Sequence, residues 1–379
     1  MKEEPRDAVA TDDAVDDAAI EEKEPQEGGL HAWLTVVGSA LVYFASFGFM
    51  NSFGYFQDFY QANYLANYSS STIAFIGTLQ ISLMYVVGPV AGALFDSYGL
   101  KGVLFGLTVA FGVQPALAAA GQHFKQRRAL AMGVVAGGSS IGGVCLPIMF
   151  SRIVPKIGFG WSVRVAALLF LCCYLAAMCI SRTKRAPKKA PAAAQTAVSN
   201  GSLLDFNGFK DPRYLALAIG SFVASLGLYV PYYYIESYTV LAHPSASIHI
   251  YLLPLINAAS FFGRVIGGFL ADRVGRLNLL YPMTLLSGVF CLAIWLPAGS
   301  NSVAAVVAFV CLYGFSSGIF ISVTPAVVAQ LSPDDAIGAR IGAFFTLAAV
   351  ATLGLTLTVG GAFLLFARVL CERDLRTKW

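Results

Sequence analysis

The chain contains one loop pattern twice, as GALFDSYGLK at residues 92–101 and as GFLADRVGR at residues 268–276. Both copies read G-x-L-x-D-x-x-G and place an aspartate, Asp96 or Asp272, between two long apolar stretches. One copy of so short a pattern is weak evidence, whereas two copies in corresponding loops indicate that the chain is built from two duplicated halves. Parallel repeats related by an axis normal to the bilayer are one architecture of membrane proteins.

Ten apolar stretches surround these loops, each long enough to cross the hydrocarbon layer of a bilayer as a helix. Of the 379 residues, 57% are hydrophobic and 12% are charged, and the mean hydropathy is +0.68. A soluble domain carries about 25% charged residues, so a soluble enzyme is excluded. The stretches lack the alternating pattern of a membrane barrel, so we expect an all-α, polytopic membrane helix bundle with two pseudo-symmetric halves. They cover residues 31–56, 73–95, 100–121, 129–150, 163–181, 214–236, 248–270, 278–298, 303–328 and 340–367.

Charged residues divide the chain into tails, halves and a linker. Residues 1–29 hold eleven acidic and three basic residues and almost no large apolar ones, which predicts a disordered acidic tail in the cytosol. Residues 182–213 are polar and carry seven Lys or Arg residues, which predicts a basic cytosolic linker. The linker separates transmembrane halves at 30–181 and 214–370, and residues 371–379 form a polar tail. The basic loops fit the cytosolic face of a membrane, and no pattern suggests nucleic acid binding.

Cysteine spacing and sequons indicate little chemistry. None of the seven cysteines forms a CxxC pair or a Cys/His spacing suited to zinc, so we expect no metal site and no cofactor. Asn67 begins the sequon Asn-Tyr-Ser in the first outer loop and is a candidate glycosylation site, whereas Asn200 begins a sequon in the cytosolic linker.

These features together resemble the major facilitator superfamily, in which the repeated loop marks a cytosolic gate. Two further segments are similar to its monocarboxylate porter branch. EGGLHAW at 27–33 resembles the signature at the start of the first helix, and HFKQRRALAMGVVAGGSSIGG at 123–143 resembles the second signature, although His123 and Gln126 depart from it. Stretches at 157–164, 209–214, 257–278 and 327–335 look like fungal members. The matching signature residues are Gly28, Gly29, Trp33, Phe124, Arg127, Arg128, Leu130, Ala131 and Gly133.

The two loops are candidates for a gate that latches one state of a rocking bundle. A carboxylate between two helices can accept hydrogen bonds from the N–H groups at a helix N-terminus. Basic side chains lie close to both aspartates in the sequence and can pair with them in one state and separate in the other. The alternative is a solvated loop that orients the protein by charge alone. The gate residues are Asp96, Lys101, Asp272, Arg273 and Arg276.

Arg264 is the most informative side chain, because it lies within the apolar stretch 248–270, where a charge is costly without a partner. A buried guanidinium facing a central cavity can bind a carboxylate through two hydrogen bonds. The resemblance implies the same role, since porters of this branch bind the anion with an arginine in this helix. The alternative is an internal strut paired with the gate carboxylates.

Two positions depart from the porters that carry lactate-like anions. The resemblance implies an aspartate one turn before the arginine, where this chain has Ser260, and a lysine in the first helix, where it has Asn51. Proton–lactate symport is therefore disfavoured, and a larger, less charged substrate is favoured. Tyrosines around Pro231, among them Tyr233, suit either an interfacial belt or the aromatic wall of a substrate cavity.

The helix count is a conflict within the sequence, since the family has twelve crossings and this chain has about ten. The stretch 100–121 begins like the third family helix and ends like the fourth, and 340–367 begins like the eleventh and ends like the twelfth. Strict alternation then places Lys125, Arg127, Arg128 and the linker on the side opposite to a cytosolic N-terminus, against the positive-inside rule. We favour missing segments over an abnormal span at 100–121.

The sequence therefore predicts a secondary active transporter in the plasma membrane that works by alternating access and exports an organic acid or acidic secondary metabolite. Its partners are this small molecule and the lipid bilayer, with protons as a coupling ion. One alternative is proton-coupled uptake of a short monocarboxylate. Another is a non-transporting nutrient sensor, for which the tail and linker are too short and polar. A membrane enzyme is disfavoured because no His/Asp/Glu or Ser/His constellation is evident within the helices.

Overall fold

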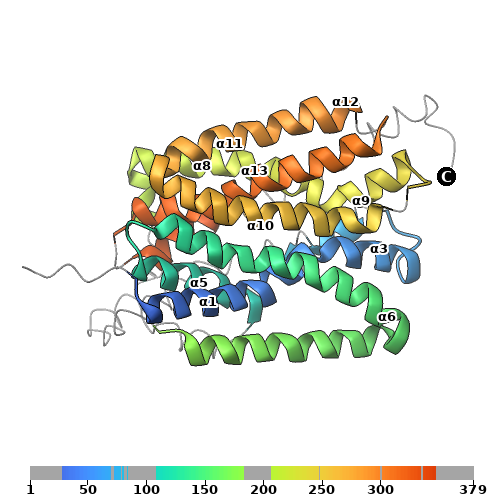
Figure 1. Cartoon of the computed structure of the whole chain (residues 1–379), viewed down its shortest axis with the longest axis horizontal. Coiled ribbons are helices and arrows are strands. Elements are labelled where there is room, and N and C mark those ends of the chain that lie inside the picture. The colour runs from blue at the N-terminus through green and yellow to red at the C-terminus, as the bar shows by residue number, and fades with distance from the viewer. Residues whose placement is uncertain are drawn as a thin grey trace, which may run out of the picture.

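A computed structural model describes residues 28–69, 72–77, 79–80, 83, 108–182, 206–246, 248–298, 301–333 and 336–346. Within these ranges every regular element is a helix, and the longer helices run along one common direction (Figure 1). The all-α membrane bundle is confirmed. Asp96, Lys101, most of 81–107 and all of 347–379 lie outside the described residues.

The N-terminal half begins with a broken helix and ends with a helical hairpin. Helices α1 (Leu30–Ala45), α2 (Phe47–Asn51) and α3 (Phe53–Asn63) follow one another with single-residue breaks. Helix α5 (Thr108–His123) precedes α6 (Arg128–Ile180), which is 53 residues long. The chain of α6 reverses at Gly158, whose φ of +78° favours glycine, so α6 crosses the bundle and returns (Figure 1).

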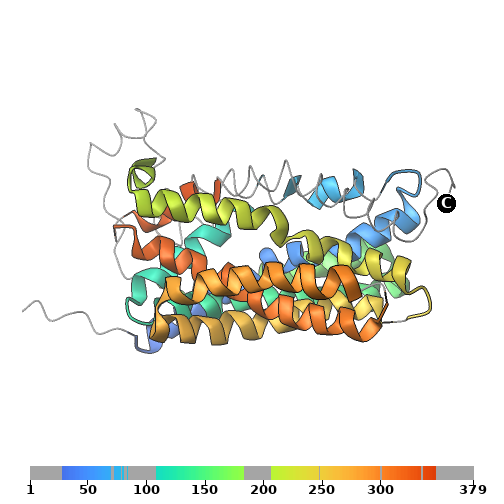
Figure 2. The same ribbon diagram turned by 90° about the horizontal axis from the view of Figure 1, so that it is seen from above.

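The C-terminal half contains longer unbroken helices. Helix α8 (Pro212–Leu228) bends into α9 (Val230–Ala242) at Tyr229 (Figure 2), and a short helix, η1 (Phe206–Lys210), precedes them. Helices α10 (His249–Val274) and α11 (Arg276–Phe290) are joined by Gly275 alone. A π-helical turn, η2 (Cys291–Trp295), leads through α12 (Leu296–Ala298) to α13 (Val303–Gln330). A last described helix covers Ile337–Thr346.

Five of the described helices are long and apolar enough to cross a membrane, counting α8 with α9 and α11 with η2. They are Arg128–Ile180, Pro212–Ala242, His249–Val274, Arg276–Trp295 and Val303–Gln330. Because the first of these reverses at Gly158, it supplies both of the crossings expected at 129–150 and 163–181.

Small residues allow α6 to lie directly against its neighbours in both halves. A Cβ atom at Gly142 would lie 2.6 Å from the Cα atom of Gly48 in α2, and one at Gly133 would overlap the backbone carbonyl of Arg264 in α10. Such close backbone approach is how membrane helices gain packing energy in the absence of a hydrophobic driving force. The contact between α6 and α10 therefore forms the centre of the interface between the two halves.

One end of the bundle, here called the basic end, gathers the start of α1 and the basic segments. Thr35 donates to the carbonyl of Arg182 at 3.1 Å, and the Nε2 atom of His123 lies 2.8 Å from the same oxygen. The rings of Trp33 and Phe124 contact each other with centroids 5.1 Å apart. The opposite end, here called the far end, holds α3, the end of α9 and the start of α10 (Figure 1).

This arrangement corrects the prediction that strict alternation separates Lys125, Arg127 and Arg128 from the N-terminal end of the bundle. The structure places the start of α1, the end of α5 and both ends of α6 together at the basic end. Lys125, Arg127 and Arg128 then lie on the same side as the start of α1, as the positive-inside rule requires. Most of the segment 81–107 that connects these helices lies outside the described residues.

Candidate functional site

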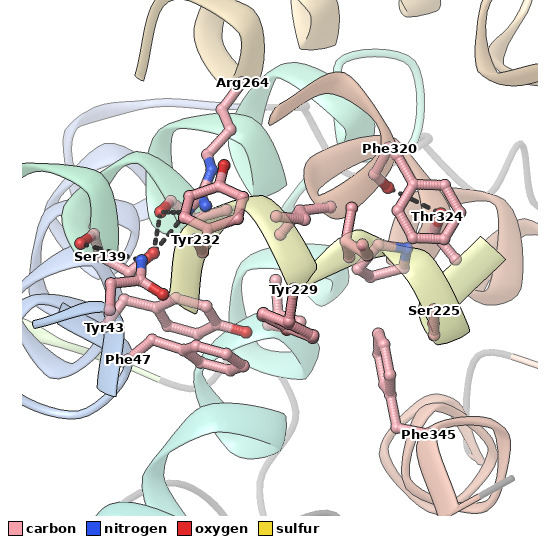
Figure 3. A pocket seen from close by; sticks show the side chains of 16 residues that line it. Tyr43, Phe47, Ser139, Ser225, Tyr229, Tyr232, Arg264, Phe320, Thr324 and Phe345 are labelled. Atoms are coloured by element: carbon pink, nitrogen blue, oxygen red, sulfur yellow. Dashed lines mark hydrogen bonds between the residues drawn. The ribbon is translucent and has the colours of Figure 1, made fainter. Parts of the chain in front are cut away.

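A small aromatic cavity lies at the interface between the two halves (Figure 3). The space open to the centres of water molecules is about 40 Å³. One water needs about 10–15 Å³ by this measure, so the cavity holds only about three waters in this conformation. A molecule larger than a few waters therefore does not fit in this cavity in this conformation. The lining residues are Tyr43, Phe47, Asn51, Leu117, Ala136, Ser139, Ser225, Leu228, Tyr229, Tyr232, Arg264, Phe320, Ile321, Thr324, Pro325 and Phe345.

Arg264 reaches from α10 towards α6 at the cavity wall and is only 2% exposed. Its Nε donates to Ser260 at 3.1 Å, and its Nη1 donates to the carbonyl of Ala136 at 2.6 Å and to the hydroxyl of Ser139. All of these partners are uncharged. Among the described residues, the ion pairs are Arg213 with Asp211 and Arg276 with Asp272, so Arg264 is not the strut paired with Asp272 that the sequence left open.

This environment makes Arg264 a strong attractor for an anion. A charge in a low-dielectric site costs free energy that neutral hydrogen bonds repay only in part. The planar guanidinium can also offer a pair of parallel donors to one carboxylate. A cavity with this side chain in its wall is therefore suited to an acidic group.

Three of the four predicted substrate-binding residues lie together. Ser260 holds the Nε of Arg264, and Asn51 lines the same cavity, where its side-chain amide donates to the carbonyl of Ser139 at 3.5 Å. Tyr233 is the exception, because its ring contacts Phe53, with centroids 5.9 Å apart, and it does not line the cavity. The tyrosines of the wall are Tyr43, Tyr229 and Tyr232.

The sequence reasoning missed Tyr43 and Ser139. A signal for Tyr43 was available, because Tyr43 and Phe47 are four residues apart and stack with an interplanar angle of 17° on one face of the first helix. The cluster around Pro231 is also buried rather than placed in an interfacial belt, with Tyr232 5% exposed and Tyr234 2% exposed.

Asp272 joins the two halves at the basic end. Its carboxylate accepts from the backbone N–H groups of Ala129 at 3.1 Å and Leu130 at 2.8 Å, which are the free donors at the start of α6. Arg276 donates to the same carboxylate at 2.9 and 3.0 Å and also to the carbonyl of Lys125 at 2.8 Å. The expected helix N-terminus is thus present, but it belongs to the other half of the molecule.

Arg273, the neighbouring gate candidate, takes no part in this network. Its guanidinium lies over the ring of Phe269, 4.2 Å from the centroid. The second loop therefore contributes Asp272 and Arg276 to the contact between the halves. Asp96 and Lys101 of the first loop lie outside the described residues.

The far end carries a pair of carboxyl groups that the sequence analysis overlooked. The carboxyl groups of Asp58 on α3 and Glu236 on α9 lie close enough to interact, and His249 on α10 is close enough to act on Asp58 by its charge. Two carboxyl groups this close repel each other when both are ionised. The available signal was Glu236, an acidic residue at the end of the apolar stretch 214–236.

Apolar contacts around this pair hold the halves together at the far end. Phe53 contacts Tyr233, and a Cβ atom at Gly54 would lie only 2.9 Å from a methyl carbon of Leu253 and 3.8 Å from a carboxylate oxygen of Glu236. Among the described residues, the two halves thus contact each other at both ends of the bundle. No group of three or more His, Cys, Asp or Glu side chains within these ranges is placed to hold a metal ion.

Comparison with known proteins identifies the family. The chain matches the Major Facilitator Superfamily over residues 100–356. It belongs to the Major Facilitator Superfamily. The MFS transporter asaE of Aspergillus flavus is 36% identical over 90% of this chain and 81% of the relative. The fujikurins efflux protein of Gibberella fujikuroi is 35% identical over 96% of this chain and 83% of the relative, and the aspyridones efflux protein apdF of Emericella nidulans is 33% identical over 88% and 72%.

The fold of this facilitator is also found in a solved structure. The crystal structure of the human organic anion transporter MFSD10 (TETRAN) matches with a TM-score of 0.60 at 15% identity, covering 90% of this chain and 98% of the other. The chain is therefore a multi-pass membrane transporter of small molecules and not an enzyme. Membership of the monocarboxylate porter branch stays a prediction.

The signature residues of this facilitator hold the basic end together. Gly28 and Gly29 have φ angles of +93° and +94°, which favour glycine, and Gly29 is the residue before α1. Arg128 is 6% exposed and donates to the carbonyls of Phe124 at 3.0 Å and Ala329 at 2.9 Å, so it connects α6 to α13. Arg127 is exposed at the start of α6. Asn67 is exposed in the loop after α3, as a glycosylation site requires.

Proposed function

We propose that this facilitator exports an organic acid or an acidic secondary metabolite by alternating access, with Arg264 as the anion-binding residue. The observation that carries the proposal is a buried guanidinium with only neutral partners in the wall of an aromatic cavity between the halves. Two relatives that are named as efflux proteins for fujikurins and aspyridones support the direction of transport.

The aromatic side chains of the cavity indicate the rest of the substrate. Tyr43 and Phe47 stack on one wall, and Tyr229 and Phe320 contribute further rings. Apolar walls with a few polar groups are typical of sites that bind a largely apolar small molecule. A substrate with one acidic group and a conjugated or apolar body uses both features, whereas a lactate-sized anion uses only Arg264.

We propose further that the basic end faces the cytosol and the far end faces outside the plasma membrane. The positive-inside rule supports this orientation, because Lys125, Arg128, Arg182 and Arg276 gather at one end. Removal of N-linked glycan from intact cells should then shift the mobility of the wild-type chain but not of Asn67→Gln. An epitope inserted near residue 188 should be inaccessible from outside, and surface labelling of it would reverse the orientation.

A binding experiment discriminates recognition of an anion from general apolar binding. The full chain in lipid nanodiscs is titrated with matched pairs of aromatic acids and their methyl esters, and binding is followed by the shift in unfolding temperature. Acids should stabilise the wild type more than esters do, and Arg264→Lys should lose this preference by about 10- to 100-fold in affinity, as expected for a charge-assisted hydrogen bond worth about 1.5–3 kcal/mol.

Arg273→Lys provides the matched control, because this arginine lies on the same helix but stacks on Phe269 outside the cavity. Its preference for acids should stay at the wild-type level. Two outcomes would show that Arg264 does not bind the substrate. One is an equal loss of the preference for acids in both variants, and the other is a preference for acids that survives in Arg264→Lys.

A further inference from the structure

A second and more open recess lies on the outer face of the C-terminal half, between α8, α9, α11, η2 and α13. The space open to the centres of water molecules is about 320 Å³, compared with about 40 Å³ in the central cavity. Two residues at its rim, Val223 and Leu292, are 59% and 67% exposed, so the recess opens sideways towards the lipid. We call it the lateral groove. Its walls include Gly227, Leu228, Pro231, Thr284, Ser287, Gly288, Cys291, Trp295, Tyr313 and Phe320.

The lateral groove offers an apolar surface, because the hydroxyl groups in its wall are already bonded. Thr284 and Ser287 donate to the carbonyls one turn earlier in α11, at 2.8 and 3.0 Å. Tyr313 donates to the carbonyl of Leu228 at 2.7 Å. The groove therefore favours the apolar body of a molecule over a charged head.

One layer of side chains separates the lateral groove from the central cavity. Leu228 and Phe320 line both spaces and are 8% and 7% exposed. Figure 3 shows Phe320 at the side of the cavity away from Arg264. These two side chains are therefore a wall that the groove shares with the cavity of Arg264.

The backbone is irregular on two walls of the groove. Helix α8 ends at Leu228 and α9 begins at Val230, with Pro231 unable to donate a helical hydrogen bond across the break. The facing wall contains the π-helical turn Cys291–Trp295, a distortion that is frequent at functional sites. The Leu228 carbonyl left at the break accepts from the Tyr313 hydroxyl, which ties the Leu228 backbone to α13 and leaves its side chain between the two spaces.

We propose that the lateral groove binds the transported amphiphilic metabolite from the bilayer and that Leu228 and Phe320 form a side-chain door into the central cavity. The proposal rests on the proposed function, because its occupant is the exported molecule. The apolar body enters the groove first, and the acidic group reaches Arg264 when the door opens. The two side chains that line both spaces, Leu228 and Phe320, favour this occupant over a bystander lipid.

Glycines in the chain provide plugs that do not disturb packing. Gly227 and Gly288 line the groove, and a Cβ atom at either would meet nothing within 4 Å. Gly227→Trp and Gly288→Trp should therefore fill the groove without a clash. Gly220→Trp is the matched control, because Gly220 lies two turns earlier on α8, is equally open and does not line the groove.

The test uses the full chain in nanodiscs and two photoreactive probes, a diazirine-bearing dodecanoate and a diazirine-bearing phospholipid. Mass spectrometry should locate saturable dodecanoate labelling in 223–231 and 284–295, with competition by unlabelled dodecanoate. Labelling should fall at least fivefold in both plugged variants and stay unchanged in Gly220→Trp. Labelling that persists in the plugged variants, or phospholipid labelling of the groove that dodecanoate does not displace, would overturn the proposal.

A further variant distinguishes failure of this inference from failure of the proposed function. In Arg264→Ala the groove should still be labelled by dodecanoate, whereas the preference for acids over esters should be lost. Intact acid preference with no groove labelling overturns only the lateral groove. Intact, plug-sensitive labelling with no acid preference in the wild type overturns only the anion site.

Discussion

The two ends of the interface between the halves are held by different chemistry. At the basic end, Asp272 accepts two backbone N–H groups and pairs with Arg276, whose side chain is 11% exposed. At the far end, the carboxyl groups of Asp58 and Glu236 lie close together. The first contact pairs a carboxylate with hydrogen-bond donors, whereas the second brings together two carboxyl groups, which is favoured when one of them keeps its proton. We therefore expect the contact at the basic end to act as a latch that is independent of a proton and the contact at the far end to act as a proton-dependent latch.

The largest effect is expected at Asp272. Asp272→Ala leaves the buried guanidinium of Arg276 and two N–H groups of α6 without their acceptor, which should cost about 3–5 kcal/mol. Asp272→Asn keeps one acceptor oxygen and should cost less while still slowing transport. Thermal unfolding in nanodiscs and uptake into vesicles provide the measurements. Arg273→Ala is the control and should unfold like the wild type. Similar losses of stability and transport in Asp272→Ala and Arg273→Ala would mean that the loop only orients the protein in the membrane by its charge.

A second test at the basic end compares two adjacent signature arginines. Arg128 donates to the carbonyls of Phe124 and Ala329 from a buried position, whereas Arg127 is exposed. Arg128→Ala should lower the free energy of unfolding by about 1.5–3 kcal/mol, as expected for hydrogen bonds from a charged donor. Arg127→Ala should stay within about 0.5 kcal/mol, as is usual for surface changes. A larger loss of stability in Arg127→Ala than in Arg128→Ala would contradict the assignment of Arg128 as the buried, bonded guanidinium.

The sequence predicts the local chemistry of the gate but not which helices the gate connects. A carboxylate between two helices predicts a helix N-terminus as its partner, and Asp272 accepts hydrogen bonds from the start of α6. The pattern does not say which helix supplies the N–H groups, and here the donors come from Ala129 and Leu130 in the other half. Periodicity describes one helix at a time, so pairing between helices has no sequence signature in a single chain.

The same limit explains what was missed around the cavity. The position of Arg264 within an apolar stretch marked it as functional, and Ser260 lies one turn away on the same helix. Its partners Ala136 and Ser139 lie on α6 and could not be assigned to it. Glu236 is visible as an acid at the end of an apolar stretch and Asp58 follows another one, but only the fold brings them close together.

The proton-dependent latch at the far end should open as the pH rises. With both carboxyls ionised, Asp58 and Glu236 repel each other, so closure is favoured at low pH and lost at high pH. Spin labels at the exposed positions Asn63 and Leu241 report the distance between α3 and α9. The ratio of open to closed molecules should rise about tenfold, which corresponds to about 1.4 kcal/mol.

Two variants identify the groups that are responsible for this pH dependence. Glu236→Gln keeps a donor for Asp58 without a titrating proton and should hold the far end closed across the same pH range. His249→Gln removes the third titratable group that acts on the pair, and it should leave the direction of the response unchanged. An unaltered pH response in Glu236→Gln, or a reversed one in His249→Gln, would contradict the latch.

The smallest effect is expected at Asp211, which resembles Asp272 in its partners but not in its burial. It accepts from the backbone N–H of Arg213 at 2.9 Å at the start of α8 and pairs with the Arg213 guanidinium at 3.0 Å. Hydrogen bonds from Arg213 hold the pKa of the Asp211 carboxyl below its usual value. Since the folded-state pKa is lowered, the contribution is present above the ordinary pKa and is lost as the pH falls through the lowered one.

Hydrogen exchange at the start of α8 measures this contribution when the wild type and Asp211→Ala are compared at each pH. Asp211→Ala should raise exchange only in the first turn of α8 at neutral pH, because its side chain caps that turn at the exposed surface, where water screens the charge. The difference from the wild type should disappear in acid. The unfolding temperature should barely move, in contrast to Asp272→Ala. A comparable drop in the unfolding temperature of both variants would contradict this prediction. It would mean that burial does not determine how much each carboxylate contributes, so Asp272 at the contact between the halves would not differ from a surface helix cap.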